Sequence, residues 1–438
     1  MPEPPSSPVT NPEFELLLGV VRSHPAPGPL PVGINWPGFL DLCRAHAVRP
    51  LVYRYLTSVE SQLPPQVLDD LGRFTAANAR RNAILALELT RLLHALEKRG
   101  IQAATFKGPV LAEHVYGSLA LREFLDIDLI VCPRDFPGAS ELLRAEGYQS
   151  GANSSPGPED YVAANGQLAF YRPGTGFGVD LHSKLAPFGL AFPFSDDELW
   201  ANLQTLSVSG SGVKTLSWEH LALFLAFHGS KERWRSLKWV CDFAFLAARR
   251  TELDWKQLLR RAARNHCSRD LLVAAQLTQA LGLDAPPALL AAAGADPAAR
   301  SQARRTLQSL ANPQPESDLS VFIYSLRGQE RLRDKLRLAA RLIATLTESD
   351  FRAVRLPARL HWLYYPIRPV RILAKALGQA FTRLRPVTAP PDTSRPHPPV
   401  PASAPPRTPP SAHSPAPKTS AAVPRSGTPA RSSDADPR

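Results

Sequence analysis

Apolar residues recur at intervals of three or four along the first hundred residues, which is the spacing of amphipathic helices. Two helices are predicted here, one over 36–56 with an interruption near Pro50 and one over 71–99. Gly100 follows the second helix as a stop signal. The apolar series of the second helix comprises Leu85, Leu89, Leu92, Leu93 and Leu96.

The pattern changes after Gly100, where apolar residues come in short runs bounded by glycine and proline. Runs of this length are typical of strands, and the intervening segments keep a helical pattern. The predicted elements are a strand at 101–106, a helix at 107–116, a strand at 124–131, a helix at 133–146 and a hairpin of strands at 167–171 and 178–185.

Helical spacing returns after Ser217 and continues through most of the second half of the chain. The predicted helices lie at 218–228, 233–249, 255–265, 269–281 and 329–346. The last one is basic and amphipathic. Its apolar side would carry Leu332, Leu336, Ala339, Ile343 and Leu346.

Composition separates the ends of the chain from its interior. Residues 386–438 contain no aromatic residue and are dominated by Pro, Ala, Ser and Thr. Such a segment buries too little apolar surface to offset its conformational entropy, so we expect disorder there and in residues 1–12. The predicted order is therefore disordered 1–12, helical 13–98, α+β 99–207, helical 208–385 and disordered 386–438.

The formal net charge of +12 is unevenly distributed. Residues 321–385 hold 14 basic and 4 acidic residues, whereas 1–320 hold 31 basic and 32 acidic. A near-neutral core argues against a broad nucleic-acid-binding surface. The basic segment 321–385 is the place where we expect any peripheral contact with a membrane or a protein.

Four cysteines show no paired spacing, which suits the reduced thiols of a cytosolic protein. The N-terminus lacks the basic and apolar regions of a signal peptide, and no uncharged apolar run reaches the roughly 18 residues that span a bilayer. We therefore expect a cytoplasmic protein.

Asp126 and Asp128 interrupt the otherwise apolar strand at 124–131. Side chains alternate along a strand, so the two carboxylates share one face while Ile127, Leu129 and Val131 share the other. Two like charges this close repel each other unless a cation lies between them. Mg²⁺ is the natural cation for paired carboxylate oxygens, so the sequence indicates a metal site on the sheet.

Motifs around this strand resemble a known signature. Gly117-Ser118, then Arg122, then the Asp-Ile-Asp strand resemble the DNA polymerase β nucleotidyltransferase superfamily. Phe106-Lys107-Gly108 and Val179-Asp180-Leu181-His182 narrow the likeness to an uncharacterised bacterial nucleotidyltransferase family. The resemblance implies an α+β, polymerase-β-like domain with a small mixed sheet, flanked by N- and C-terminal helical regions.

The resemblance also implies roles for individual residues. Two Mg²⁺ ions about 4 Å apart would hold the attacking and leaving oxygens of a nucleoside triphosphate, which is the substrate. Asp126 and Asp128 would hold both ions. Asp180 would hold the catalytic ion and help to activate the acceptor hydroxyl. The residues expected to contact the nucleotide or its phosphates are Lys107, Gly117, Ser118, Arg122 and His182.

Plainer interpretations of these residues stay open. Asp180 fits a surface strand position, and His182 fits a hydrogen-bonded core residue. Lys107 and Arg122 fit structural partners of the carboxylates, and Asp242 fits a partner of a nearby basic residue.

Two main functions follow from the sequence. The first is a Mg²⁺-dependent nucleotidyltransferase that moves a nucleoside monophosphate from an NTP, such as ATP, to a hydroxyl of a small molecule, sugar or protein. The second is an inert nucleotide-binding scaffold protein of a biosynthetic or membrane-associated complex. A third, nucleic-acid processing, predicts steeply salt-dependent binding, which the near-neutral core disfavours.

Overall fold

The structure is a computed structural model that describes residues 11–22, 30–58, 63–150, 166–187, 190–313, 318–344, 354, 358–372 and 374. Residues 1–385 form one unit and residues 386–438 another. The predicted disorder of 386–438 and of residues 1–10 falls outside the described residues. Pro12, at the end of the predicted disordered N-terminus, instead begins helix α1.

A mixed sheet of seven strands, in the order β3-β4-β5-β2-β1-β7-β6, forms the centre of the first unit. β2 pairs in parallel with β5 and antiparallel with β1, and β1 pairs in parallel with β7. The strands are β1 Ala103–Thr105, β2 Asp126–Val131, β3 Gln149–Ser150, β4 Gln167–Arg172, β5 Phe177–His182, β6 Leu203–Val208 and β7 Ser211–Leu216. This confirms the α+β class and the predicted mixed sheet.

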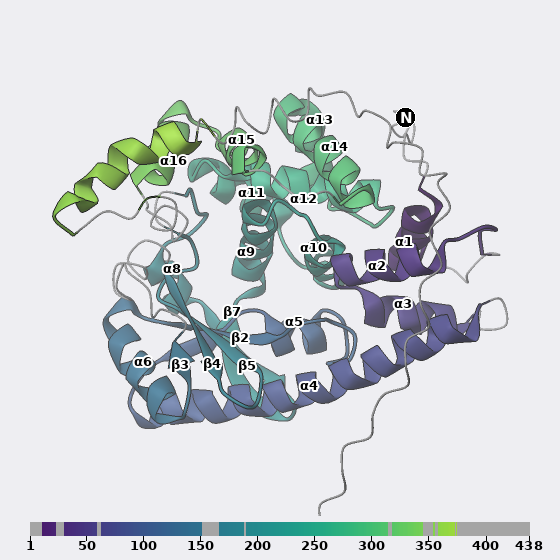
Figure 1. Cartoon of the computed structure of the whole chain (residues 1–438), viewed down its shortest axis with the longest axis horizontal. Coiled ribbons are helices and arrows are strands. Elements are labelled where there is room, and N and C mark those ends of the chain that lie inside the picture. Colours follow the sequence, from purple (N-terminus) through teal and green to yellow (C-terminus); the bar gives the residue numbers. More distant parts are fainter. Residues whose placement is uncertain are drawn as a thin grey trace, which may run out of the picture. The chain divides into compact units, whose positions relative to one another are not determined.

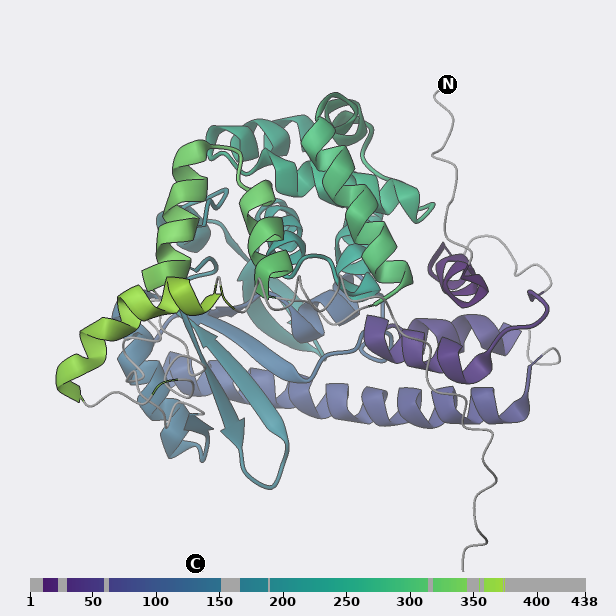
Figure 2. The ribbon, with the colours of Figure 1, turned by 45° about the horizontal axis from the view of Figure 1, so that its top comes forward.

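One face of the sheet packs on α4 (Pro65–Lys98), the long helix that runs beneath the strands in Figures 1 and 2. Ile127, Leu129 and Val131 of β2 share a buried apolar cluster with Leu85 and Leu89 of α4. Helix α6 (Phe136–Ala145), preceded by the short 3₁₀ helix η2 (Pro133–Asp135), completes this layer.

The opposite face of the sheet turns toward the C-terminal helices. Ile130 of β2 points to this opposite face. It belongs to a second buried cluster that includes Phe106 and Phe224. Because side chains alternate along β2, Asp126 and Asp128 share the face of Ile130. The fold therefore directs both carboxylates toward the C-terminal helices.

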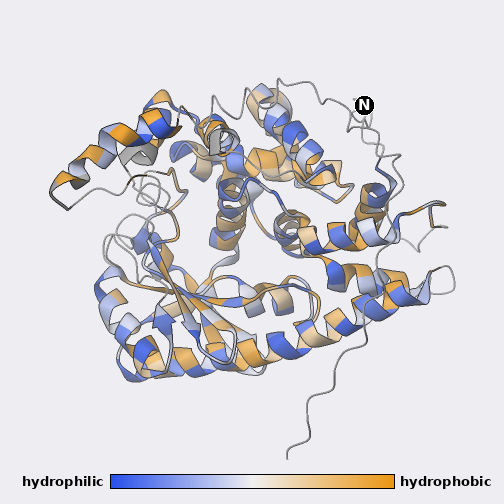
Figure 3. Ribbon diagram, viewed as in Figure 1, coloured by the Kyte–Doolittle hydropathy of each residue, from blue (hydrophilic) through white to orange (hydrophobic). Residues whose placement is uncertain are grey.

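Helices before and after the sheet build the rest of the unit, and α9 and α12 among them are largely hydrophobic in Figure 3. The remaining helices are α1 Pro12–Arg22, α2 Trp36–His46, α3 Arg49–Leu56, α5 Gly108–His114, α8 Asp196–Ala201, α9 Trp218–Lys231, α10 Leu237–Arg249, α11 Trp255–Arg264, α12 Ser268–Ala280, α13 Pro287–Ala295, α14 Pro297–Ala311, α15 Asp318–Gly328, α16 Leu332–Ala344 and the 3₁₀ helix η3 Ala358–Leu363.

Most predicted elements occur within a few residues of their expected bounds. Residues from 208 onward are assigned to the predicted C-terminal helical region, and the β6–β7 hairpin is not among the predicted elements. It extends the sheet to Leu216, past the predicted limit of the α+β region. The hairpin is part of the same sheet because Thr105 of β1 pairs with Thr215 of β7. The strand pairing therefore ties the α+β region to the start of the C-terminal helices.

The basic helix α16 exposes part of its predicted apolar side. Leu332 and Leu336 are 71% and 61% exposed, whereas Leu338 is buried. The side chains of Ile343 and Leu346 fall outside the described residues. A peripheral contact through 321–385 stays a prediction.

Candidate active site

Three carboxylates meet on the face of the sheet that looks toward the C-terminal helices. Asp126 and Asp128 lie on β2, and Asp180 lies directly opposite Asp128 on the neighbouring strand β5. Asp128 is 2% exposed. Burial and the charge of Asp128 raise the pKa of both Asp126 and Asp180 above the ordinary range of an aspartate. The repulsion within this group favours the binding of a cation.

Lys107 and His182 flank Asp128. The ammonium Nζ of Lys107 lies 2.7 Å from Oδ1 of Asp128, and Nε2 of His182 lies 3.4 Å from the same oxygen. Burial acts to raise the pKa of Asp128, but the charge of Lys107 and the contact with His182 outweigh it and hold that pKa far below its usual value. Asp128 is therefore ionised at every physiological pH.

A divalent cation fits this group. One ligand atom from each of Asp128, Asp180 and His182 lies within 4.8 Å of the other two. Neither buried ring nitrogen of His182 meets hydrogen-bond geometry, although Nε2 lies 3.4 Å from Oδ1 of Asp128. A ligand bound to the ring would therefore satisfy a buried polar group. Asp126, predicted to be a ligand, lies beside this set on β2 but is not among its three members.

The carboxylates line a cavity of about 460 Å³ between the sheet, the N-terminal helices and α9–α10. This is a typical size for a small-molecule site. The cavity is rich in positive charge, which suits a polyanion such as a triphosphate. Its basic lining residues are Arg44, Arg49, Arg81, Lys107, Arg122, Lys231 and Lys238.

Arg122 lines the cavity, but its guanidinium is also engaged in a buried ion pair. Nε and Nη2 each lie 2.8 Å from an oxygen of Asp242 on α10, and the hydroxyl of Tyr116 donates to the same carboxylate at 2.8 Å. Both partners are nearly inaccessible, at 4% and 2% exposed. The pair joins the segment before β2 to the C-terminal helices across 120 residues of sequence.

Gly117 and Ser118 follow the C-terminal end of α5 and are not among the described residues that line the cavity. Gly117 has a φ of +84°, and a Cβ there would lie 3.0 Å from Nη2 of Arg249. The hydroxyl of Ser118 accepts a hydrogen bond from the backbone N–H of Ala120. The structure thus gives this pair a turn-forming role, whereas Lys107, Arg122 and His182 all reach the cavity.

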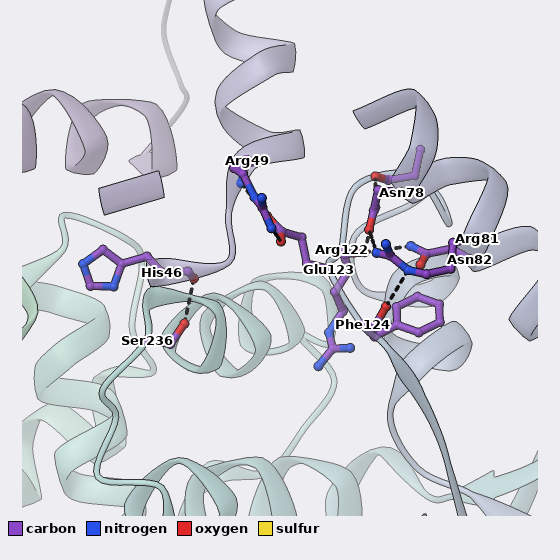
Figure 4. Close-up of polar contacts among 10 residues, drawn as sticks. His46, Arg49, Asn78, Arg81, Asn82, Arg122, Glu123, Phe124 and Ser236 are labelled. Atoms are coloured by element: carbon purple, nitrogen blue, oxygen red, sulfur yellow. Dashed lines mark hydrogen bonds and ion pairs between the residues drawn. The ribbon is translucent and has the colours of Figure 1, made fainter. Parts of the chain in front are cut away.

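The segment that leads into β2 is held by side chains that the sequence analysis did not single out. Asn78 and Asn82 of α4 both donate to the backbone carbonyl of Arg122, at 3.2 Å and 2.8 Å (Figure 4). They also reach the carbonyls of Ala120 and Leu119, respectively. Both asparagines are fully buried. Two polar residues four positions apart on the buried face of a long helix are the signal that points to such a role.

An ion pair fixes the same segment from the N-terminal helices. Nε and Nη2 of Arg49 contact the two oxygens of Glu123, at 3.1 Å and 2.6 Å. Nearby, Arg81 of α4 donates to the carbonyl of Phe124 at 3.3 Å (Figure 4). The backbone immediately before Asp126 is therefore anchored from two helices.

Opposed carboxylates beside a lysine and a histidine on a mixed sheet could hold a divalent cation and a phosphate group. The profile of a family described as uncharacterised nucleotidyltransferase matches residues 33–282. The chain belongs to this family. It is therefore an enzyme of the nucleotidyltransferase class, for which an NTP is the implied substrate.

Solved structures with local similarity include the antibiotic-resistance factor ANT(2'')-Ia in solution, at 14% identity over 42% of this chain and 91% of that one. A crystal structure of ANT(2'')-Ia in complex with adenylyl-2''-tobramycin matches at 14% identity over 41% and 95%. An antigenic nucleotidyltransferase-like protein from Paracoccidioides brasiliensis matches at 18% identity over 47% and 96%. The TM-score is 0.29 in each case.

No curated protein matches the chain. Among the described residues, none of the helices combines the length and the apolar character that crossing a membrane requires.

Proposed function

We propose that this protein is a divalent-metal-dependent nucleotidyltransferase that transfers a nucleoside monophosphate from an NTP to a hydroxyl of a small molecule, sugar or protein. The observation that carries this proposal is the register of the sheet, which sets Asp128 opposite Asp180 with Asp126 on the same face. When bound, a divalent cation supplies Lewis-acid stabilisation of charge on the transferred phosphate. Mg²⁺ is the expected ion, and two ions are expected by the resemblance.

Residues of the chain have separate tasks in this proposal. Asp128 and Asp180 hold the metal, Asp126 completes the carboxylate group, and Asp180 helps to remove the proton of the acceptor hydroxyl. Lys107 neutralises Asp128 and lines the cavity, so its ammonium is placed to meet phosphate oxygens.

Lys238 is a second cation suited to the triphosphate. Burial and the neighbouring Arg122 lower its pKa. Lys238 makes no ion pair among the residues that the structure describes. A half-buried ammonium that is not held in an ion pair gains more from an incoming phosphate than a paired one does. Trp239, beside it on α10, also lines the cavity and offers an aromatic surface for the base.

Pyrophosphate release with each NTP, in the presence of Mg²⁺ and a cell extract as the source of acceptor, tests the proposal. Release from the wild type should depend on an extract and on a divalent cation, and should fall by several orders of magnitude in Asp128→Asn. Asp69→Asn is the matched control because Asp69 is an exposed residue of α4. NTP binding without release for any nucleotide would contradict transfer and favour the scaffold.

A further inference from the structure

His182 occupies a position at which a ligand to the metal is expected. It lies two residues after Asp180 on β5, so alternation places both side chains on the same face. It also pairs in register with Ile130, two residues after Asp128 on β2. The ring packs edge-on against Phe106 at 5.1 Å between centroids, which fixes its orientation.

The ring nitrogens of His182 are less well satisfied than those of a structural histidine. The residue is 6% exposed, Nδ1 has no hydrogen-bond partner among the described residues, and Nε2 has only the 3.4 Å contact with Oδ1 of Asp128, which does not meet hydrogen-bond geometry. By contrast, Nε2 of the buried His46 lies 3.0 Å from the carbonyl of Leu310. A buried imidazole that makes no well-formed hydrogen bond is costly unless another group binds to it. Its neighbours Asp128 and Asp180 indicate that this occupant is a cation.

A nitrogen ligand changes which ion the site selects. Mg²⁺ prefers oxygen ligands and octahedral geometry, whereas first-row transition ions accept imidazole readily. We infer that His182 is a ligand of the metal site and gives it a preference for a transition ion such as Mn²⁺ over Mg²⁺. This inference rests on the proposed function only for the location of the metal, and it departs from an all-carboxylate site.

Electron spin-echo measurements on Mn²⁺ bound to the metal-free protein, without nucleotide, test the inference directly. The wild type should show ¹⁴N modulation, and selective ¹⁵N-histidine labelling should alter it. This readout needs no variant. An absence of histidine nitrogen coupling in the wild type at stoichiometric Mn²⁺ would overturn the assignment.

Affinity measurements with Mn²⁺ and Mg²⁺ separate His182 from other nitrogens of the cavity. His182→Asn should remove the modulation and weaken Mn²⁺ binding by roughly tenfold or more, with a smaller change for Mg²⁺. His228→Asn is the matched control because His228 lines the same cavity but is outside the metal cluster. It should retain the modulation and the preference for Mn²⁺. Circular dichroism of both variants confirms that they fold.

The result is distinguishable from a failure of the proposed function. Histidine coupling without pyrophosphate release would support His182 as a metal ligand and contradict the proposed transfer reaction. Pyrophosphate release without coupling, and with equal affinity for both ions, would do the reverse.

Discussion

Replacement of Asp242 by alanine tests whether Arg122 is a structural residue or a free phosphate ligand. The change removes a carboxylate that is 2% exposed and leaves a guanidinium that is 4% exposed without its counter-charge. Removal of one partner of a buried ion pair typically costs about 3–5 kcal/mol. The hydroxyl of Tyr116 also loses its closer acceptor and keeps only the carbonyl of Lys238 at 3.4 Å. We therefore expect a loss of about 3–5 kcal/mol in the free energy of unfolding.

Urea unfolding, with the free energy extrapolated to water, measures this loss. The double variant Arg122→Met with Asp242→Leu removes both charges and should be much more stable than the sum of the single changes predicts. Asp41→Ala is the control because Asp41 pairs with Arg44 on the surface, at 71% and 66% exposed. Its cost should stay below about 1 kcal/mol.

A change of less than about 1 kcal/mol in Asp242→Ala would refute the structural role, given the magnitude expected for a buried pair. The double variant then addresses catalysis. If Arg122 only joins the sheet to α10, the KM for NTP should stay near that of the wild type once folding is restored. A large rise in that KM would show that Arg122 also binds phosphate.

Three further predictions concern other positions. Asn82→Ala should cost about 1–3 kcal/mol of unfolding free energy. The part-buried carbonyl of Leu119 loses its side-chain donor, and the carbonyl of Arg122 keeps only the donor of Asn78. Arg80→Ala, exposed on the same helix, should cost little, and equal costs for the two variants would contradict this. Lys238→Met should raise the KM for NTP roughly tenfold through loss of a charged hydrogen bond, whereas Lys214→Met, on an exposed position of β7, should not. Burial raises the pKa of Asp270 to about 7 in the folded state. The folded protein therefore retains this proton between about pH 4 and 7 while the unfolded chain releases it, and stability falls as pH rises across that window. Asp270→Asn should remove this dependence of the unfolding free energy on pH and should stabilise the protein at pH 8 but not at pH 4. Urea unfolding at both pH values measures the effect. An unchanged pH dependence in Asp270→Asn would contradict the raised pKa of Asp270.

Much of the carboxylate group was predictable because it depends on local pattern. Alternation along a strand puts Asp126 with Asp128 and Asp180 with His182 on common faces. Parallel pairing of β2 with β5 then brings the two faces together. The register itself, Asp128 opposite Asp180, is a long-range property that the residues between these strands do not encode.

Contacts over long separations account for what the sequence analysis could not foresee. The position of Arg122 near the Asp-x-Asp strand suggests a contact with phosphate. Its structural partner, Asp242, lies 120 residues away in a helix. The β6–β7 hairpin carries a Ser-Gly turn at 209–210, but β7 becomes part of the sheet only by pairing with β1, about 110 residues earlier. A local pattern does not identify either partner.

The two helical regions act on the same few residues before β2. Asn78 and Asn82 hold the backbone of Arg122 from the N-terminal side, while Asp242 holds its side chain from the C-terminal side. A metal site tolerates little displacement of its ligands, because coordination geometry is fixed to within a few tenths of an ångström. Asp126 lies only four residues after Arg122. Movement of either helical region would therefore shift the carboxylates of β2 relative to Asp180. The flanking helices therefore help to position the proposed metal ligands, since both of them hold the residues just before β2.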